Sequence, residues 1–186
     1  MTVQSCSPPA STDVTNIGGV MPDLRFAMTR ANDDRPVGAR DYLGKIVILY
    51  FGYTHCPDEC PATLANLASA LRPLGAREHA IKVLFATVDP RRDSLSALKS
   101  YVSAFAPEID GLRGSDDAIA ALARRYRVLY AQSPASNGGG YAVMHSDSVF
   151  VFDAQGHARF VATSTRDTAA ITAILRRLEI HGPSGS

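Results

Sequence analysis

The stretch Ile46-Val-Ile-Leu-Tyr-Phe-Gly-Tyr-Thr-His-Cys-Pro-Asp-Glu-Cys-Pro61 leads from an unbroken apolar run into two cysteines flanked by prolines. Residues 46–51 are apolar at every position and β-branched at the start, which is typical of a strand covered on both faces. Beyond Pro61, apolar residues recur at helical spacing until Pro73 and Gly75. The stretch therefore predicts a central strand, a short turn and a helix.

Further strand and helix patterns surround this unit. Residues 81–88 form a second apolar run and predict another buried strand. Near the N-terminus an alternating segment predicts an edge strand that folds back as a hairpin, and an Asp-Ala-Gln-Gly turn separates two later strands. The other predicted strands span residues 24–28, 146–152 and 158–162, and the other predicted helices span 93–105, 116–126 and 167–178. This order indicates an α/β fold with a central mixed β-sheet flanked by helices and an N-terminal β-hairpin.

The length of 186 residues suits one main domain with its own core. Residues 1–20 are rich in Ser, Thr, Pro and Gly without periodicity, so we expect a flexible leader there. Residues 181–186 have the composition of a flexible tail. The domain is therefore expected over residues 21–180.

The composition excludes several classes of protein. With 46% hydrophobic and 20% charged residues, the chain resembles neither a disordered protein nor a membrane protein. Nineteen basic and eighteen acidic residues leave a formal charge of +1, and no Lys/Arg cluster could neutralise a run of phosphates, so no nucleic-acid partner is expected. No apolar run approaches the roughly 20 residues of a membrane-crossing helix, and no signal peptide is visible.

The cysteine pair carries the chemical information. Cys56 and Cys60 are four residues apart at the start of the predicted helix, a spacing that places both sulfurs on one face. The free N–H groups and the dipole at a helix N-terminus favour a thiolate at Cys56. Such a pair can close a disulfide or bind a soft cation such as Cu(I) or Zn(II), and two small buried thiols without a role are the bland alternative. Cys6, in the polar leader, is interpreted as an inert thiol.

His145 is the histidine of interest. It follows the glycine-rich segment 136–140, which reads as a mobile loop, and it precedes a strand that could run beside the central one. A ligand on a loop and an ordinary polar residue at a strand start are equally supported by the pattern alone. The remaining histidines are expected in a loop or facing solvent; they are His55, His79, His157 and His181.

Three motifs in order resemble the Sco/SenC family of copper-binding cytochrome oxidase assembly proteins. They are Tyr50-Phe-Gly-Tyr-Thr-His-Cys-Pro-Asp-Glu-Cys-Pro61, Thr87-Val-Asp-Pro-Arg-Arg-Asp93 and Met144-His-Ser-Asp-Ser-Val-Phe-Val-Phe-Asp153. The resemblance covers residues 21 to about 179 and implies a thioredoxin-like fold.

The resemblance also implies a ligand set. By position, Cys56, Cys60 and His145 would bind one copper ion per chain, as Cu(I) or Cu(II), and the two cysteines would also form the redox pair. Two thiolates suit Cu(I), and an added imidazole allows Cu(II). Asp89 and Asp93 would support the site without ligating, although a helix N-cap is an equally good reading of Asp93.

The implied function is that of a copper metallochaperone for the dinuclear copper centre in subunit II of cytochrome c oxidase, with reduction of the thiols of that centre as an associated role. Subunit II is the expected partner, with another copper donor or a thiol-disulfide reductant beside it. The expected location is the periplasmic side of the cytoplasmic membrane, held by an anchor that is missing from this sequence, or the intermembrane space in mitochondria.

The main alternative is a thiol-disulfide oxidoreductase or thiol peroxidase on the same fold. In that case Cys56 attacks and Cys60 resolves, and His145 is not needed. A sensor module, in which oxidation or copper changes a docking surface, is a third class.

Overall fold

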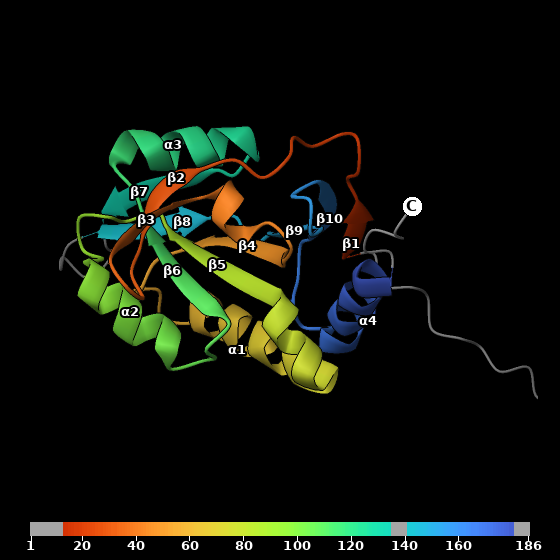
Figure 1. Ribbon diagram of the computed structural model, residues 1–186. Helices are drawn as coiled ribbons and strands as arrows, with labels where there is room; N and C mark the ends of the chain where they lie inside the picture. The colour runs from red at the N-terminus through yellow and green to blue at the C-terminus, as the bar shows by residue number, and fades with distance from the viewer. Residues whose placement is uncertain (1–12, 135–140, 181–186) are drawn as a thin grey trace, which may run out of the picture.

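The computed structural model describes residues 13–134 and 141–180, and it arranges their strands in two sheets (Figure 1). The main sheet is mixed, because its three central strands run parallel while the strands on either side pair antiparallel. A separate two-stranded ribbon is formed by β7 (Tyr130–Pro134) and β8 (Tyr141–His145). In spatial order, the strands of the main sheet are β1 (Val14–Asn16), β10 (Ala158–Ala162), β9 (Val149–Phe152), β4 (Ile46–Gly52), β5 (Ile81–Thr87), β6 (Ile109–Arg113), β2 (Ala27–Arg30) and β3 (Arg35–Gly38).

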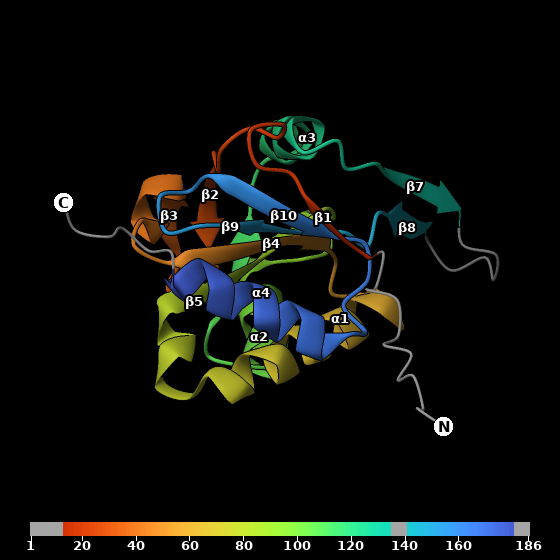
Figure 2. The same cartoon turned by 90° about the vertical axis from the view of Figure 1, so that its right-hand side faces the viewer.

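Helices cover both faces of this sheet. Figure 2 shows α1 (Glu59–Leu71), α2 (Leu95–Ser103) and α4 (Thr168–Ile180) on one side and α3 (Asp116–Arg125) on the other. Two short 3-10 segments, Ala39–Tyr42 and Arg72–Ala80, complete the described helical structure. No helix in the described residues is both long enough and apolar enough to cross a bilayer.

The core is built on β4 and β5. Every residue of β4 is buried, as the unbroken apolar run predicts, because the strand is covered by helices on both faces. The aromatic side chains of Tyr50, Phe51 and Phe85 are fully buried there. The predicted α/β fold with a central mixed sheet is therefore confirmed, including the N-terminal hairpin of β2 and β3.

Two predictions about the N-terminal part are wrong. The expected flexible leader contains β1, whose residue Val14 pairs with Ala162 at one edge of the main sheet, while residues 1–12 of that segment lie outside the described part of the chain. The strand predicted at 24–28 forms at Ala27–Arg30, and it is not an edge strand, because it pairs with β3 on one side and with β6 on the other. The predicted glycine-rich loop at 136–140 and the tail at 181–186 also lie outside the described residues.

Candidate metal centre

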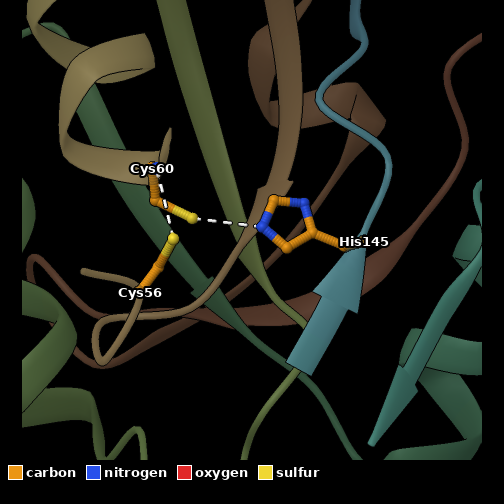
Figure 3. Close-up of side chains that lie close together, drawn as sticks. All are labelled: Cys56, Cys60 and His145. Carbon is orange, nitrogen blue, oxygen red and sulfur yellow. Dashed lines mark hydrogen bonds between the residues drawn. The ribbon is translucent and has the colours of Figure 1, made fainter. Parts of the chain in front are cut away.

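Three side chains from two distant segments meet at one end of the main sheet (Figure 3). The donor atoms of Cys56, Cys60 and His145 all lie within 4.8 Å of one another. The Sγ atom of Cys60 is 3.2 Å from Nε2 of His145, and both cysteines are free thiols. Among the described residues, this is the group whose spacing suits a bound metal ion.

The turn after β4 brings the two cysteines together. Gly52 ends this strand where the backbone passes close to the site: a Cβ there would lie 2.4 Å from Cε2 of Phe85 and 3.0 Å from Sγ of Cys60. Only glycine fits such a close approach without displacing a neighbour. The helix α1 then starts at Glu59, so Cys60 lies in its first turn and is fully buried.

Cys56 lies just before this helix and caps it. Its Sγ accepts a hydrogen bond from the backbone N–H of Cys60 at 3.4 Å. The residue at the N-cap position, Asp58, makes no side-chain capping bond, so the sulfur takes one of the N–H groups that the first turn leaves unpaired. The two cysteines therefore lie at the start of the helix, where their spacing placed them.

His145 is the last residue of β8, and its side chain is only 4% exposed. Its Nδ1 lies 3.1 Å from the carbonyl oxygen of Ser146. Because a carbonyl only accepts, this hydrogen bond places the proton of the neutral ring on Nδ1 and leaves the lone pair on Nε2, facing Cys60. The edge of the ring packs against Tyr50 and Tyr53, with ring centroids 6.0 and 5.8 Å away. The imidazole is therefore held in the form and direction that a metal ligand requires.

Burial disfavours negative charge on the side chains of the site. Burial raises the pKa of the Cys60 thiol to about 12. Burial also raises the pKa values of Tyr50, Tyr53 and Tyr101, and the nearby cysteines raise them further. Without metal, Cys60 is therefore a neutral thiol near neutral pH. A bound cation would replace its proton.

We expect this environment to show in the alkylation of Cys60. In copper-free Cys56→Ser protein, the rate of iodoacetamide labelling at Cys60 should rise about tenfold per pH unit from pH 8 to 10, because only the thiolate reacts. Because the raised pKa of Cys60 favours the neutral thiol, the labelling rate should not reach a plateau below about pH 11. Peptide mass analysis measures the rate, and the same protein in urea should level off near the ordinary thiol pKa of about 8.5. A plateau below pH 9 in the folded protein would contradict this description.

The two aspartates of the 87–93 motif, Asp89 and Asp93, are buried and do not belong to the ligand group. Asp93 is fully buried and accepts hydrogen bonds from the backbone N–H and hydroxyl of Thr54 at 3.0 and 2.6 Å and from the hydroxyl of Thr87 at 2.6 Å. It therefore holds the cysteine loop against β5. It does not cap α2, because Ser94 is the N-cap residue and accepts from the N–H of Ala97.

The other histidines that the structure describes do not belong to the three-residue group. The side chain of His55 is 53% exposed, and its Nδ1 is 3.5 Å from Asp93. The side chains of His79 and His157 are 74% and 59% exposed. His181 lies outside the described residues, as does Cys6. The sequence did not single out the tyrosines around the site, although Tyr50 and Tyr53 lie in the same stretch as the cysteines.

The family model described as SCO1/SenC matches residues 22–179, which is most of the chain. The chain belongs to the SCO1/SenC family. The predicted resemblance is thus confirmed.

Individual SCO1/SenC relatives match over the same domain. The chain is 39% identical over 139 residues to the mitochondrial protein SCO2 homolog of Bos taurus, covering 74% of this chain and 52% of that protein. It is 32% identical over 133 residues to the mitochondrial protein SCO1 homolog of Homo sapiens, covering 70% and 44%. The chain therefore spans about half the length of the curated relatives that it matches.

Solved SCO1/SenC structures share the fold. Arabidopsis thaliana ScoI with copper bound superposes with a TM-score of 0.77 at 32% identity, covering 89% of this chain and 99% of that one. Yeast Sco1 with copper bound gives a TM-score of 0.76 at 30% identity, covering 88% and 92%. These matches confirm the thioredoxin-like α/β fold.

Proposed function

We propose that this protein is a copper metallochaperone that binds one copper ion through the Sγ atoms of Cys56 and Cys60 and Nε2 of His145. The observation that carries the proposal is the convergence of these three donors within 4.8 Å, from a helix start and a strand end. Two thiolates select Cu(I), and the imidazole makes the site acceptable to Cu(II). The relatives from Arabidopsis thaliana and yeast were solved with copper bound, which supports the same cargo here.

The exposure of the ligands suits a cargo that must leave again. Cys60 and the His145 side chain are buried, whereas Cys56 is partly exposed. An acceptor ligand can therefore reach the copper from the side of Cys56. It would add to the three-ligand site, and the three donors of this protein would then release the ion one after another. The cysteines would bind copper as thiolates and the imidazole as a neutral ring, so any proton on these donors is released on binding.

The proposed acceptor is the dinuclear copper centre in subunit II of cytochrome c oxidase. Delivery to that centre places the protein on the periplasmic side of the cytoplasmic membrane or in the intermembrane space of mitochondria. The curated relatives named above are mitochondrial proteins, which supports a location outside the cytoplasm. Another copper donor or a thiol-disulfide reductant is the further partner that such a cycle needs.

A transfer experiment tests this function. Protein loaded with one equivalent of Cu(I) is mixed without oxygen with the copper-free, reduced soluble domain of subunit II, the two are separated, and their copper contents are measured. The proposal expects copper to move to subunit II in stoichiometric amounts. Retention of all the copper on this protein, with the acceptor competent to take copper from free solution, would contradict it.

The role of His145 gives a separate prediction. His145→Ala should fold normally but lower the affinity for Cu(II) at least tenfold, about 1.4 kcal/mol, because the imidazole is the donor that suits Cu(II). Competition titration with a copper chelator measures the affinity. The matched control is His157→Ala, whose exposed side chain lies outside the site and whose removal should change nothing. Unchanged Cu(II) affinity and absorption in His145→Ala would show that His145 is not a copper ligand.

Thiol-disulfide exchange is the second candidate function, favoured by the partly exposed Cys56 whose sulfur accepts the N–H of Cys60. Cys56 would attack a partner disulfide, and Cys60 would then close a disulfide with it, passing two electrons to the partner. This chemistry needs no imidazole. Reductase activity that survives in His145→Ala, together with no stoichiometric copper binding by the wild type, would favour it over the copper proposal.

A further inference from the structure

The strand that carries His145 is not part of the main sheet. The ribbon of β7 and β8 forms a sheet of its own, and Figure 2 shows it at one end of the molecule, beyond the strands of the main sheet. A two-stranded ribbon is marginally stable alone, so its position depends on what holds it to the domain. The distance of His145 from the cysteines depends on the same contacts.

One of these contacts lies at the opposite end of β8. Tyr141 is the first residue of this strand, four residues before His145, or about 13 Å along an extended chain. Its hydroxyl donates a hydrogen bond of 2.6 Å to Oδ1 of Asp89, and its backbone carbonyl accepts one of 3.0 Å from Nη1 of Arg92. The guanidinium carbon of Arg92 lies 3.9 Å from the centroid of the Tyr141 ring. Tyr141 is thus bound through its hydroxyl, its carbonyl and its ring.

The groups that hold Tyr141 are themselves fixed. Asp89 is fully buried, accepts from Nε of Arg92, and has its backbone N–H bonded to the hydroxyl of Thr87 at 3.0 Å. The Nη2 atom of Arg92 is buried and has no hydrogen-bond partner among the described residues. A buried polar atom without a partner destabilises the fold. The other contacts of the guanidinium must therefore outweigh its tendency to move into water.

The same segment also holds the cysteine loop. Asp93, one residue after Arg92, binds the backbone and the hydroxyl of Thr54, two residues before Cys56. The segment from Thr87 to Asp93 therefore joins the two parts of the chain that supply the ligands: Asp93 fixes the cysteine loop, and Asp89 with Arg92 fixes β8.

We propose that Asp89, Arg92 and Tyr141 form a latch that positions His145 against Cys60 and thereby determines whether the centre offers three donors or two. The inference rests on the proposed copper function and names positioning residues for the same site. With the latch closed, the ribbon is seated and the imidazole reaches Cys60. With the latch broken, the ribbon samples positions in which only the two thiolates remain, and the apparent affinity for a metal that needs the imidazole falls with the population of the seated state.

The test is a set of variants of the whole chain. Arg92→Ala removes the guanidinium from Asp89 and Tyr141, and Tyr141→Phe removes only the hydroxyl, which guards against a variant that fails to fold. Arg91→Ala is the matched control, because it removes the same charge one residue earlier from a side chain that is 75% exposed and pairs with Asp116, at 3.5 Å. Each variant is titrated with Cu(II) and with Cu(I), and amide hydrogen exchange is measured on the copper-free protein.

The latch predicts a tenfold or larger loss of Cu(II) affinity in Arg92→Ala, a smaller loss in Tyr141→Phe, and a change of less than threefold for Cu(I). It also predicts faster exchange of the β8 amides without copper, while the α1 amides and the Arg91→Ala control stay as in the wild type. Unchanged Cu(II) affinity and unchanged β8 protection in Arg92→Ala would overturn the latch and leave the copper function standing. If the wild type binds no copper, the proposed function fails, and the β8 protection alone still decides the latch.

Discussion

Replacing Cys60 by serine is expected to abolish stoichiometric copper binding. Its Sγ is fully buried, 3.2 Å from Nε2 of His145, and in contact range of Cys56, so it is the donor that both other ligands meet. A serine hydroxyl is a hard donor that keeps its proton, and it cannot replace a thiolate on Cu(I). We expect the Cu(I) affinity to fall at least a thousandfold, or about 4 kcal/mol.

Competition with a Cu(I)-specific chelator measures this loss. The control is Cys6→Ser, which removes the third cysteine of the chain and should leave one equivalent bound with unchanged affinity. One equivalent of copper held by Cys60→Ser at near wild-type affinity would show that the ion sits elsewhere.

Substituting Gly52 by alanine is expected to damage both the fold and the site. The new Cβ would lie 2.4 Å from Cε2 of Phe85 and 3.0 Å from Sγ of Cys60, and neither neighbour has room to move, because both are fully buried. Overpacking of this kind costs about 1–3 kcal/mol. The shift of Cys60 away from the new methyl should also weaken copper binding.

Urea unfolding of the copper-free protein measures the free energy of unfolding, and the copper titration is repeated on the folded variant. Gly18→Ala is the matched control, since its Cβ would meet the exposed Oδ1 of Asn16 at 3.2 Å, a contact that a shift of a few tenths of an ångström at the surface relieves. A Gly52→Ala protein as stable as the wild type, with full copper affinity, would contradict the close packing described for this turn.

Local patterns predicted the elements that are stabilised locally. The run in β4 is apolar on both faces because helices cover both faces, and the helical spacing after Pro61 matches the buried face of α1. The strand β6 escaped prediction because it contains Asp110 and Gly111. Asp110 is buried there, and it is satisfied by the hydroxyl of Tyr42 at 3.0 Å and by Nζ of Lys82 at 3.2 Å, partners far away in the chain that no local pattern reveals.

Long-range pairing explains the other differences. The strand β1 exists because Val14 pairs with Ala162 at the far end of the sequence, and its own residues carry no strand pattern strong enough to show this. For the site, the spacing of Cys56 and Cys60 predicted their common location, whereas His145 was undecided on pattern alone and depended on a family resemblance. The contacts of Tyr141 with Asp89 and Arg92 link segments about 50 residues apart, and only the folded chain brings them together.

The central claim is that one copper ion is held by two thiolates and one imidazole. X-ray absorption at the copper edge, on protein loaded with one equivalent of copper under anaerobic conditions, counts these donors most directly. We expect a shell of two sulfur atoms and one imidazole nitrogen in the wild type, and loss of the nitrogen in His145→Ala. A shell with sulfur alone, or with nitrogen that persists in His145→Ala, would contradict it.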